Sequence, residues 1–161
     1  MSSDDLSLDL DALALPEGWT PIDERPGFRP STPFLTSDER VSLRYFRTGV
    51  EGEIAGFIRF GLGTQGPPGH AHGGSMASVL DEAMGFACWS HDMPVLAARI
   101  EVDFRAPLPI PSLVKVQGAI TAIEGRKISA KAVLTSLDGA VFSEAKGLFV
   151  RLSREAIAKM G

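Results

Sequence analysis

Short runs of alternating apolar and polar residues flank one stretch with helical spacing. Alternation at every second position predicts strands over residues 41–48 and 53–60. Apolar residues that recur every three or four positions predict an amphipathic helix from Gly74 to Ser90. The apolar stripe of this helix comprises Met76, Val79, Leu80, Ala83, Met84 and Ala87.

After the helix the alternating pattern returns and predicts four more strands and a short final helix. The strands are expected over 99–105, 113–123, 128–134 and 141–152, and the helix over 154–160. The prolines at positions 107, 109 and 111 interrupt the first pair, because proline cannot donate to a strand ladder. Asp138-Gly139 is a strong hairpin signal. The order predicts an α+β fold in which an antiparallel sheet of five to six strands packs against one helix.

The N-terminal segment has a different composition from the rest of the chain. Residues 1–35 are acidic and rich in proline, which is typical of an arm or loose cover. We expect a short helix near residues 6–13 and expect Trp19, Phe28 and Phe34 to pin the arm to the domain. We expect residues 36–161 to form a single domain.

The amino-acid composition favours a globular protein and argues against some kinds of partner. With 161 residues, 44% hydrophobic and 22% charged, the chain is expected to be one soluble globular domain. The net charge of −4 and the lack of a basic cluster argue against nucleic acid as a partner. Neither a signal peptide nor an apolar run of about 18 residues is present, so a cytoplasmic location without membrane insertion is expected. The single cysteine, Cys88, fits a reducing compartment and is expected to be buried rather than nucleophilic.

The candidate chemistry lies at the start of the helix. Gly73 and Gly74 leave backbone N–H groups unshielded where a helix begins, and such groups attract negative charge. Asp81 follows at the border of the apolar stripe among small residues, whereas Glu82 is expected on the other side. Amides that stabilise an anion and a carboxylate that acts as a base suggest hydrolysis of an acyl group. A merely solvated role stays open for both acids.

Helix geometry indicates how these groups would meet. Asp81 lies eight residues beyond Gly73, which is roughly 12 Å along a helix axis. One straight helix cannot bring both groups to the same carbonyl, but two antiparallel copies can. The sequence therefore predicts a homodimer with two composite sites, and a tetramer stays open.

Other chemistries have weaker support. His70 and His72 form an H-x-H pair, but the chain has only three histidines and no paired cysteines, so no metal site is expected. A histidine base stays open, although we favour His72 as a residue that orders the loop by hydrogen bonds. Ser75 and Ser78 lie near the glycines without a G-x-S-x-G elbow, and no phosphate-binding P-loop motif is present.

The stretch GPPGHAHGGSMASVLDEAMG resembles the signature of the hotdog-fold acyl-CoA thioesterases of the PaaI/4HBT superfamily. It is especially similar to members related to the mammalian thioesterase-superfamily proteins. The later segment DFRAPLPIPSLVKVQG is similar to the strand–proline–strand segment of the same family. The resemblance covers roughly residues 40–151 and implies a hotdog fold, in which the sheet wraps around one long central helix.

The resemblance also assigns roles. Asp81 would be the general base or nucleophile at the thioester, and the Gly73 amide would polarise its carbonyl. His72 would support the loop. Gln65 would lie near the family's Asn or Gln that holds the water or the carbonyl, although it is one position further from the histidine than in many members.

Two further positions bear on the expected function. Arg126 and Lys127 match places where relatives often hold basic residues that bind CoA phosphates, and a solvated hairpin tip is the alternative. Ala97 stands where the family often has Thr or Ser, so one water-positioning hydroxyl is missing. The resemblance implies hydrolysis of an acyl-CoA to free acid and CoA with no separate cofactor. The alternative is a hotdog module that binds an acyl thioester or a partner without turnover.

Overall fold

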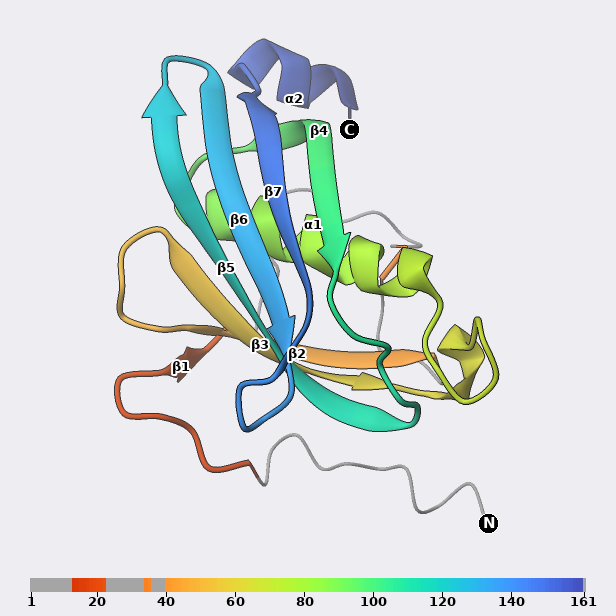
Figure 1. Ribbon diagram of the computed structural model, residues 1–161. Helices are drawn as coiled ribbons and strands as arrows, with labels where there is room; N and C mark the ends of the chain where they lie inside the picture. Colours follow the sequence, from red (N-terminus) through yellow and green to blue (C-terminus); the bar gives the residue numbers. More distant parts are fainter. Residues whose placement is uncertain (1–12, 23–33, 36–39, 161) are drawn as a thin grey trace.

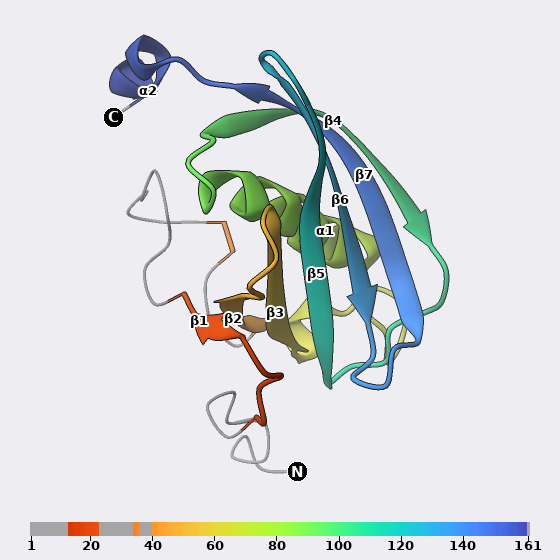
Figure 2. The same cartoon turned by 90° about the vertical axis from the view of Figure 1, so that its left-hand side faces the viewer.

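The computed structural model describes residues 13–22, 34–35 and 40–160, and its main feature is a curved antiparallel sheet around one long helix (Figure 1). The strand order is β1-β2-β3-β5-β6-β7-β4, and all neighbours are antiparallel. Figure 2 shows the helix α1 in the hollow of the sheet. The elements are β1 (Thr20–Pro21), β2 (Val41–Arg47), β3 (Glu53–Phe60), α1 (Gly73–Trp89), β4 (Val95–Phe104), β5 (Ser112–Glu124), β6 (Lys127–Thr135), β7 (Val141–Arg151) and α2 (Arg154–Met160).

The α+β class and the wrapped sheet are confirmed, and the boundaries differ from the predicted ones for local reasons. The strand β4 begins four residues before the predicted position 99, because a register shift between Ala97 and Arg99 interrupts the alternation there. Gly125 and Gly139 have φ angles of 62° and 98° in the β5–β6 and β6–β7 turns. These left-handed conformations suit glycine and explain why both hairpins turn where the sequence predicts.

The core lies between α1 and the sheet. Every residue of the predicted apolar stripe is buried, and Phe86 and Cys88 are buried with it. Gly118 on β5 allows the closest approach, because a Cβ atom there would lie 2.6 Å from the carbonyl oxygen of Ala83. Burial raises the pKa of the Cys88 thiol to about 11, which keeps it protonated and confirms that it is a buried residue.

The described part of the N-terminal segment is attached more firmly than predicted. Thr20–Pro21 forms β1, a seventh strand at the edge of the sheet, beside β2. Trp19 holds it there, with its ring centroid 5.9 Å from that of Phe46 and 6.0 Å from that of Phe57. Phe34 does not pin the segment, since it is 81% exposed, and Leu35 is buried instead. The predicted helix near residues 6–13 and the role of Phe28 lie outside the described residues.

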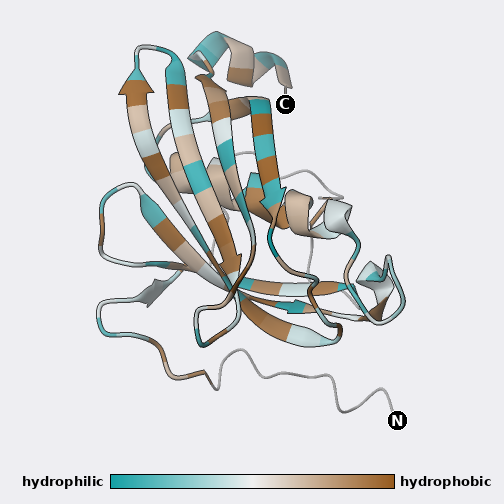
Figure 3. Cartoon of the chain, in the orientation of Figure 1, coloured by the Kyte–Doolittle hydropathy of each residue, from teal (hydrophilic) through white to brown (hydrophobic). Residues whose placement is uncertain are grey.

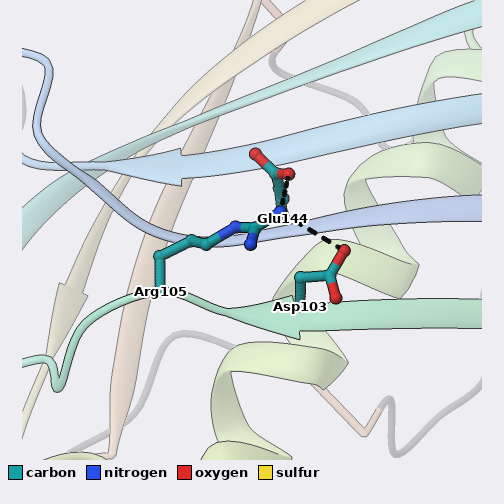
Figure 4. A network of polar contacts seen from close by, with 3 residues as sticks. All are labelled: Asp103, Arg105 and Glu144. Carbon is teal, nitrogen blue, oxygen red and sulfur yellow. Dashed lines mark hydrogen bonds and ion pairs between the residues drawn. The ribbon is translucent and has the colours of Figure 1, made fainter.

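The opposite edge of the sheet is β4, which pairs only with β7 among the described strands. Apolar and polar residues alternate along it, as the brown and teal bands in Figure 3 show. The side chains of Ile100 and Phe104 are 39% and 54% exposed. At the end of β4, Arg105 contacts Glu144 at 2.8 Å and Asp103 at 3.6 Å, which ties β4 to β7 (Figure 4). None of the helices in the described part of the chain is long and apolar enough to cross a membrane.

Candidate active site

The loop before α1 is fixed by hydrogen bonds to its own neighbours. His72 is the N-cap of the helix, and its Nδ1 accepts a hydrogen bond of 2.8 Å from the Gly74 N–H. The neutral ring therefore carries its proton on Nε2. The His72 N–H donates to the Thr64 carbonyl at 2.7 Å, and the Ala71 N–H donates to the Leu108 carbonyl at 2.9 Å. His72 orders the loop by hydrogen bonds, as the sequence predicts.

The first helical residue presents an available amide. Among the described residues, no acceptor is within hydrogen-bond distance of the Gly73 N–H. A first-turn N–H has no partner inside its own helix, so this group can donate to an anion. A Cβ atom at Gly73 would lie 3.3 Å from the Phe104 ring, and one at Gly74 would lie 3.0 Å from His72 Nδ1. A side chain at either position would therefore require a small shift of its neighbour.

Asp81 lies two turns further along α1 in a cavity of about 460 Å³, which we call the Asp81 cavity. Its carboxylate is half-buried and makes no hydrogen bond or ion pair with any residue in the described ranges. Burial raises the pKa of Asp81 above its usual value. The cavity is otherwise mostly apolar and is lined by Phe34, Leu35, Ser78, Asp81, Glu82, Gly85, Phe86, Trp89, Val95, Leu96, Ala97, Phe149 and Met160.

Glu82 lines the same cavity as Asp81. Glu82 Oε1 accepts a hydrogen bond of 3.2 Å from the Tyr45 hydroxyl. The Tyr45 ring in turn stacks on Phe86 at 4.4 Å between centroids. Glu82 is thus held by β2, whereas the neighbouring Asp81 has no hydrogen-bond or ion-pair partner in the described part of the chain.

A second cavity of about 460 Å³ lies against the first turns of α1, and we call it the His72 cavity. It shares Phe34, Leu35 and Ser78 with the Asp81 cavity, so the two are adjacent along one side of the helix. It is lined by Phe34, Leu35, Arg40, Val41, Gly63, Thr64, Gln65, His72, Gly74, Ser75 and Ser78. Gln65 uses its Oε1 to accept a hydrogen bond of 3.0 Å from the Gly69 N–H, inside the loop.

One chain therefore brings together only part of the predicted set. His72 and Gln65 lie in one cavity near Gly73, and Asp81 lies in the next one, roughly 12 Å along the helix axis from Gly73. Ala97 lines the Asp81 cavity and presents a methyl group there.

Arg126 and Lys127 are exposed in the β5–β6 hairpin and line neither of these two cavities.

The remaining histidines make structural hydrogen bonds. His70 Nδ1 lies 2.9 Å from the Pro68 carbonyl oxygen. His91 Nε2 accepts from the Gly52 N–H at 3.0 Å, and its Nδ1 lies 2.7 Å from the Ala87 carbonyl oxygen. His91 thus ties the end of α1 to the β2–β3 turn. No group of three or more His, Cys, Asp or Glu within the described ranges is placed to hold a metal ion.

The sequence analysis did not identify several of the residues that line the Asp81 cavity. Leu35 and Phe149 lie far from Asp81 along the chain and meet it only through the folded sheet. The alternating patterns place such residues in strands or in the arm, but they do not indicate which helical residue each one faces. Tyr45 likewise carries no local signal that pairs it with Glu82.

Comparison with known proteins is consistent with this geometry. Residues 68–143 match the profile of the thioesterase superfamily. The chain is 32% identical over 121 residues to acyl-coenzyme A thioesterase THEM4 of Mus musculus, an alignment that covers 73% of this chain and 52% of that protein. The chain thus spans about half the length of the curated relatives it matches.

Solved structures show the same fold. The crystal structure of a thioesterase superfamily protein is 29% identical, with a TM-score of 0.64 over 67% of this chain and 53% of the other. A hypothetical thioesterase from Streptococcus pneumoniae TIGR4, solved with coenzyme A, is 13% identical, with a TM-score of 0.61 over 63% of this chain and 82% of the other. The sheet topology, the matched profile and these likenesses together identify the chain as a hotdog-fold member of the thioesterase superfamily.

Proposed function

We propose that the protein hydrolyses an acyl-CoA thioester, with Asp81 as the catalytic base. The observation that carries this proposal is a half-buried carboxylate that has no partner among the described residues and lies in a cavity with mostly apolar and aromatic walls. A raised pKa makes an ionised Asp81 a stronger base than an exposed aspartate. The curated relatives are named acyl-coenzyme A thioesterases, and one structural neighbour was solved with coenzyme A, which favours this substrate class.

The reaction needs only water and the thioester. The water oxygen bonds to the thioester carbon while Asp81 removes one of its protons. The carbon–sulfur bond then breaks, and the proton passes from Asp81 to the departing CoA sulfur. The other water proton stays with the carboxylic acid product until the acid ionises in bulk solvent. An amide N–H at the carbonyl oxygen stabilises the negative charge that develops there.

That amide is the Gly73 N–H of a second copy of the chain. Gly73 is too far along the helix from Asp81 to act on the same carbonyl within one chain. The β4 edge offers a docking place for another copy, because it has no further strand beside it in the described sheet and exposes Ile100 and Phe104. Phe104 packs directly against Gly73, so a partner docked at this edge comes close to the helix start. A two-fold axis would then produce two equivalent sites.

The remaining predicted residues have supporting roles in this proposal. His72 keeps the glycine turn in place through its bond to Gly74, and Gln65 holds the loop through Gly69.

Arg126 and Lys127 are exposed cations that would attract the phosphates of CoA. Their contribution would be electrostatic and would weaken as salt concentration rises.

A thiol-release screen over short, long and aryl acyl-CoA substrates tests the proposal. We expect turnover of at least one class, and we expect Asp81→Asn to lower kcat/KM by about 10²- to 10⁴-fold. Glu51→Gln, in the exposed β2–β3 turn and away from both cavities, is the control and should behave as wild type. An Asp81→Asn protein that hydrolyses the best substrate at the wild-type rate would contradict the assignment.

A second candidate function is a module that binds an acyl thioester without hydrolysing it. Ala97 favours it, because the Asp81 cavity lacks a hydroxyl at that position. Acyl-CoA binding measured by calorimetry, with no thiol release from any substrate class, would select this candidate instead.

A further inference from the structure

Ser78 supplies a hydroxyl group to the Asp81 cavity. Among the described residues that line this cavity, only Ser78 carries a hydroxyl, and Ala97 on β4 presents a methyl group. Hydrolysis requires a water molecule to be oriented toward the thioester carbon, and a single hydrogen bond to a carboxylate leaves the water free to rotate about that bond. A second acceptor near Asp81 would fix that orientation.

Ser78 lies three residues before Asp81 on α1, so the two side chains are neighbours on the helix surface. Residues at this spacing have Cβ atoms about 5–6 Å apart. Their oxygen atoms can both reach one water molecule through hydrogen bonds of about 2.8 Å.

The hydrogen bond that Ser78 already makes leaves it able to act as an acceptor. Its hydroxyl donates to the Gly74 carbonyl at 2.7 Å, so its proton is already engaged. The lone pairs of Oγ remain able to accept a hydrogen bond. Ser78 is therefore suited to accept a proton from a water molecule, and it is not suited to attack the substrate.

We propose that Ser78 positions the hydrolytic water in place of the absent hydroxyl at position 97. The water donates one hydrogen bond to Ser78 Oγ and the other to the Asp81 carboxylate. Its free lone pair then points toward the thioester carbon. Asp81 takes the transferred proton, and Ser78 keeps its own proton on the bond to Gly74 throughout. The inference rests on the proposed hydrolysis and adds a positioning residue to it.

Ser90 provides a matched control at the other end of the same helix. Its hydroxyl donates to the Ala87 carbonyl at 3.2 Å, so it makes the same kind of bond to the helix backbone as Ser78 does. However, Ser90 lines neither the His72 cavity nor the Asp81 cavity. Loss of either hydroxyl removes one hydrogen bond to the backbone of α1, but only loss of Ser78 should affect the water.

The test compares Ser78→Ala, Ser78→Thr and Ser90→Ala on the best acyl-CoA substrate. We expect Ser78→Ala to lower kcat about tenfold with little change in KM, since it removes one hydrogen bond to the water. Ser78→Thr should keep most of the activity, and the kcat of Ser90→Ala should stay close to that of wild type. The acid limb of the pH–rate profile should stay in place in Ser78→Ala, because Asp81 remains the titrating base.

A double variant separates positioning from folding. Adding Ala97→Thr to Ser78→Ala should restore much of kcat, because a hydroxyl then enters the same cavity from β4. Melting temperatures show whether each variant is folded. If the double variant has a higher kcat than Ser78→Ala but no higher melting temperature, the hydroxyl acts by positioning the water. Wild-type kcat in Ser78→Ala, or equal losses of kcat in Ser78→Ala and Ser90→Ala, would overturn the inference. Absence of thiol release from the wild-type protein would instead reject the proposed hydrolysis itself.

Discussion

The two cavities along α1 differ in how their polar groups are satisfied. At the His72 end, His72, Gln65 and Ser75 each hydrogen-bond to nearby backbone groups. At the Asp81 end, the carboxylate has no protein partner in the described part of the chain and its pKa is raised by burial. The hydrogen bonds at the His72 end hold the conformation of the loop. The Asp81 end keeps a reactive carboxylate available, which lowers the free energy of unfolding. A hydrolase that divides its site between two subunits needs both kinds of end.

The largest expected effect tests whether the two ends act on each other across a dimer. Asp81→Asn alone and Gly73→Pro alone should each be nearly inactive, the latter because proline has no N–H to donate, although it is tolerated at the first position of a helix. Mixing and reassembling the two variants in equal amounts should restore about one quarter of wild-type turnover. Half of the dimers are then hybrids, and each hybrid contains one intact composite site.

The control for this mixture is either variant reassembled with itself, which should stay inactive. If the mixture also stays inactive while sedimentation shows that hybrid dimers form, Asp81 and Gly73 do not share a site across subunits. A solution mass equal to one chain would contradict the dimer directly.

A second effect concerns pH and arises only at the Asp81 end. Because the pKa of Asp81 in the folded protein is raised, kcat/KM should fall on the acid side at a pH above the usual range of aspartate. The sign for stability is opposite to that of a salt-bridged acid. The free energy of unfolding loses a contribution as pH rises through the raised pKa, since ionisation is disfavoured in the folded state.

Asp81→Asn should therefore melt at a higher temperature than wild type at neutral pH, and the difference should shrink as pH falls from the raised pKa to that of an unfolded aspartate. Thermal melts across this pH range measure it, with Glu51→Gln in the exposed β2–β3 turn as the control. A neutral-pH melting temperature of Asp81→Asn below that of wild type would contradict the desolvation argument.

The sequence predicts the two ends unequally well. The helix boundaries are within one residue of the predicted ones, because a strong apolar stripe and a His-Gly-Gly start are both local signals. Asp81 stands out for a local reason as well, as a carboxylate among small residues. The surroundings of Asp81 do not follow from local patterns, since Leu35, Tyr45 and Phe149 reach α1 only through tertiary packing.

The strands show the same difference between features set by local sequence patterns and features set by tertiary packing. The strands β5, β6 and β7 follow from alternation and clear turns, whereas β1 exists because Trp19 packs on two phenylalanines from other strands. The surroundings of Glu82 show the same limit. A helical wheel places it on another side of α1 from Asp81, but it does not indicate that one cavity includes both acids or that a tyrosine from β2 holds the second one.

The smallest expected effect lies at the His72 end. His72→Ala removes the cap that accepts from the Gly74 N–H, so the free energy of unfolding should fall by about 1 kcal/mol and the melting temperature by about 2–4 °C. His72→Asn should recover most of this loss, because a short polar side chain can accept the same bond. His70→Ala is the control, since the His70 ring contacts the Pro68 carbonyl within the loop and does not cap the helix. The comparison of the two cavities requires opposite signs, with His72→Ala less stable and Asp81→Asn more stable than wild type. If both variants shift in the same direction, the distinction between a shape-holding end and a reactive end is wrong.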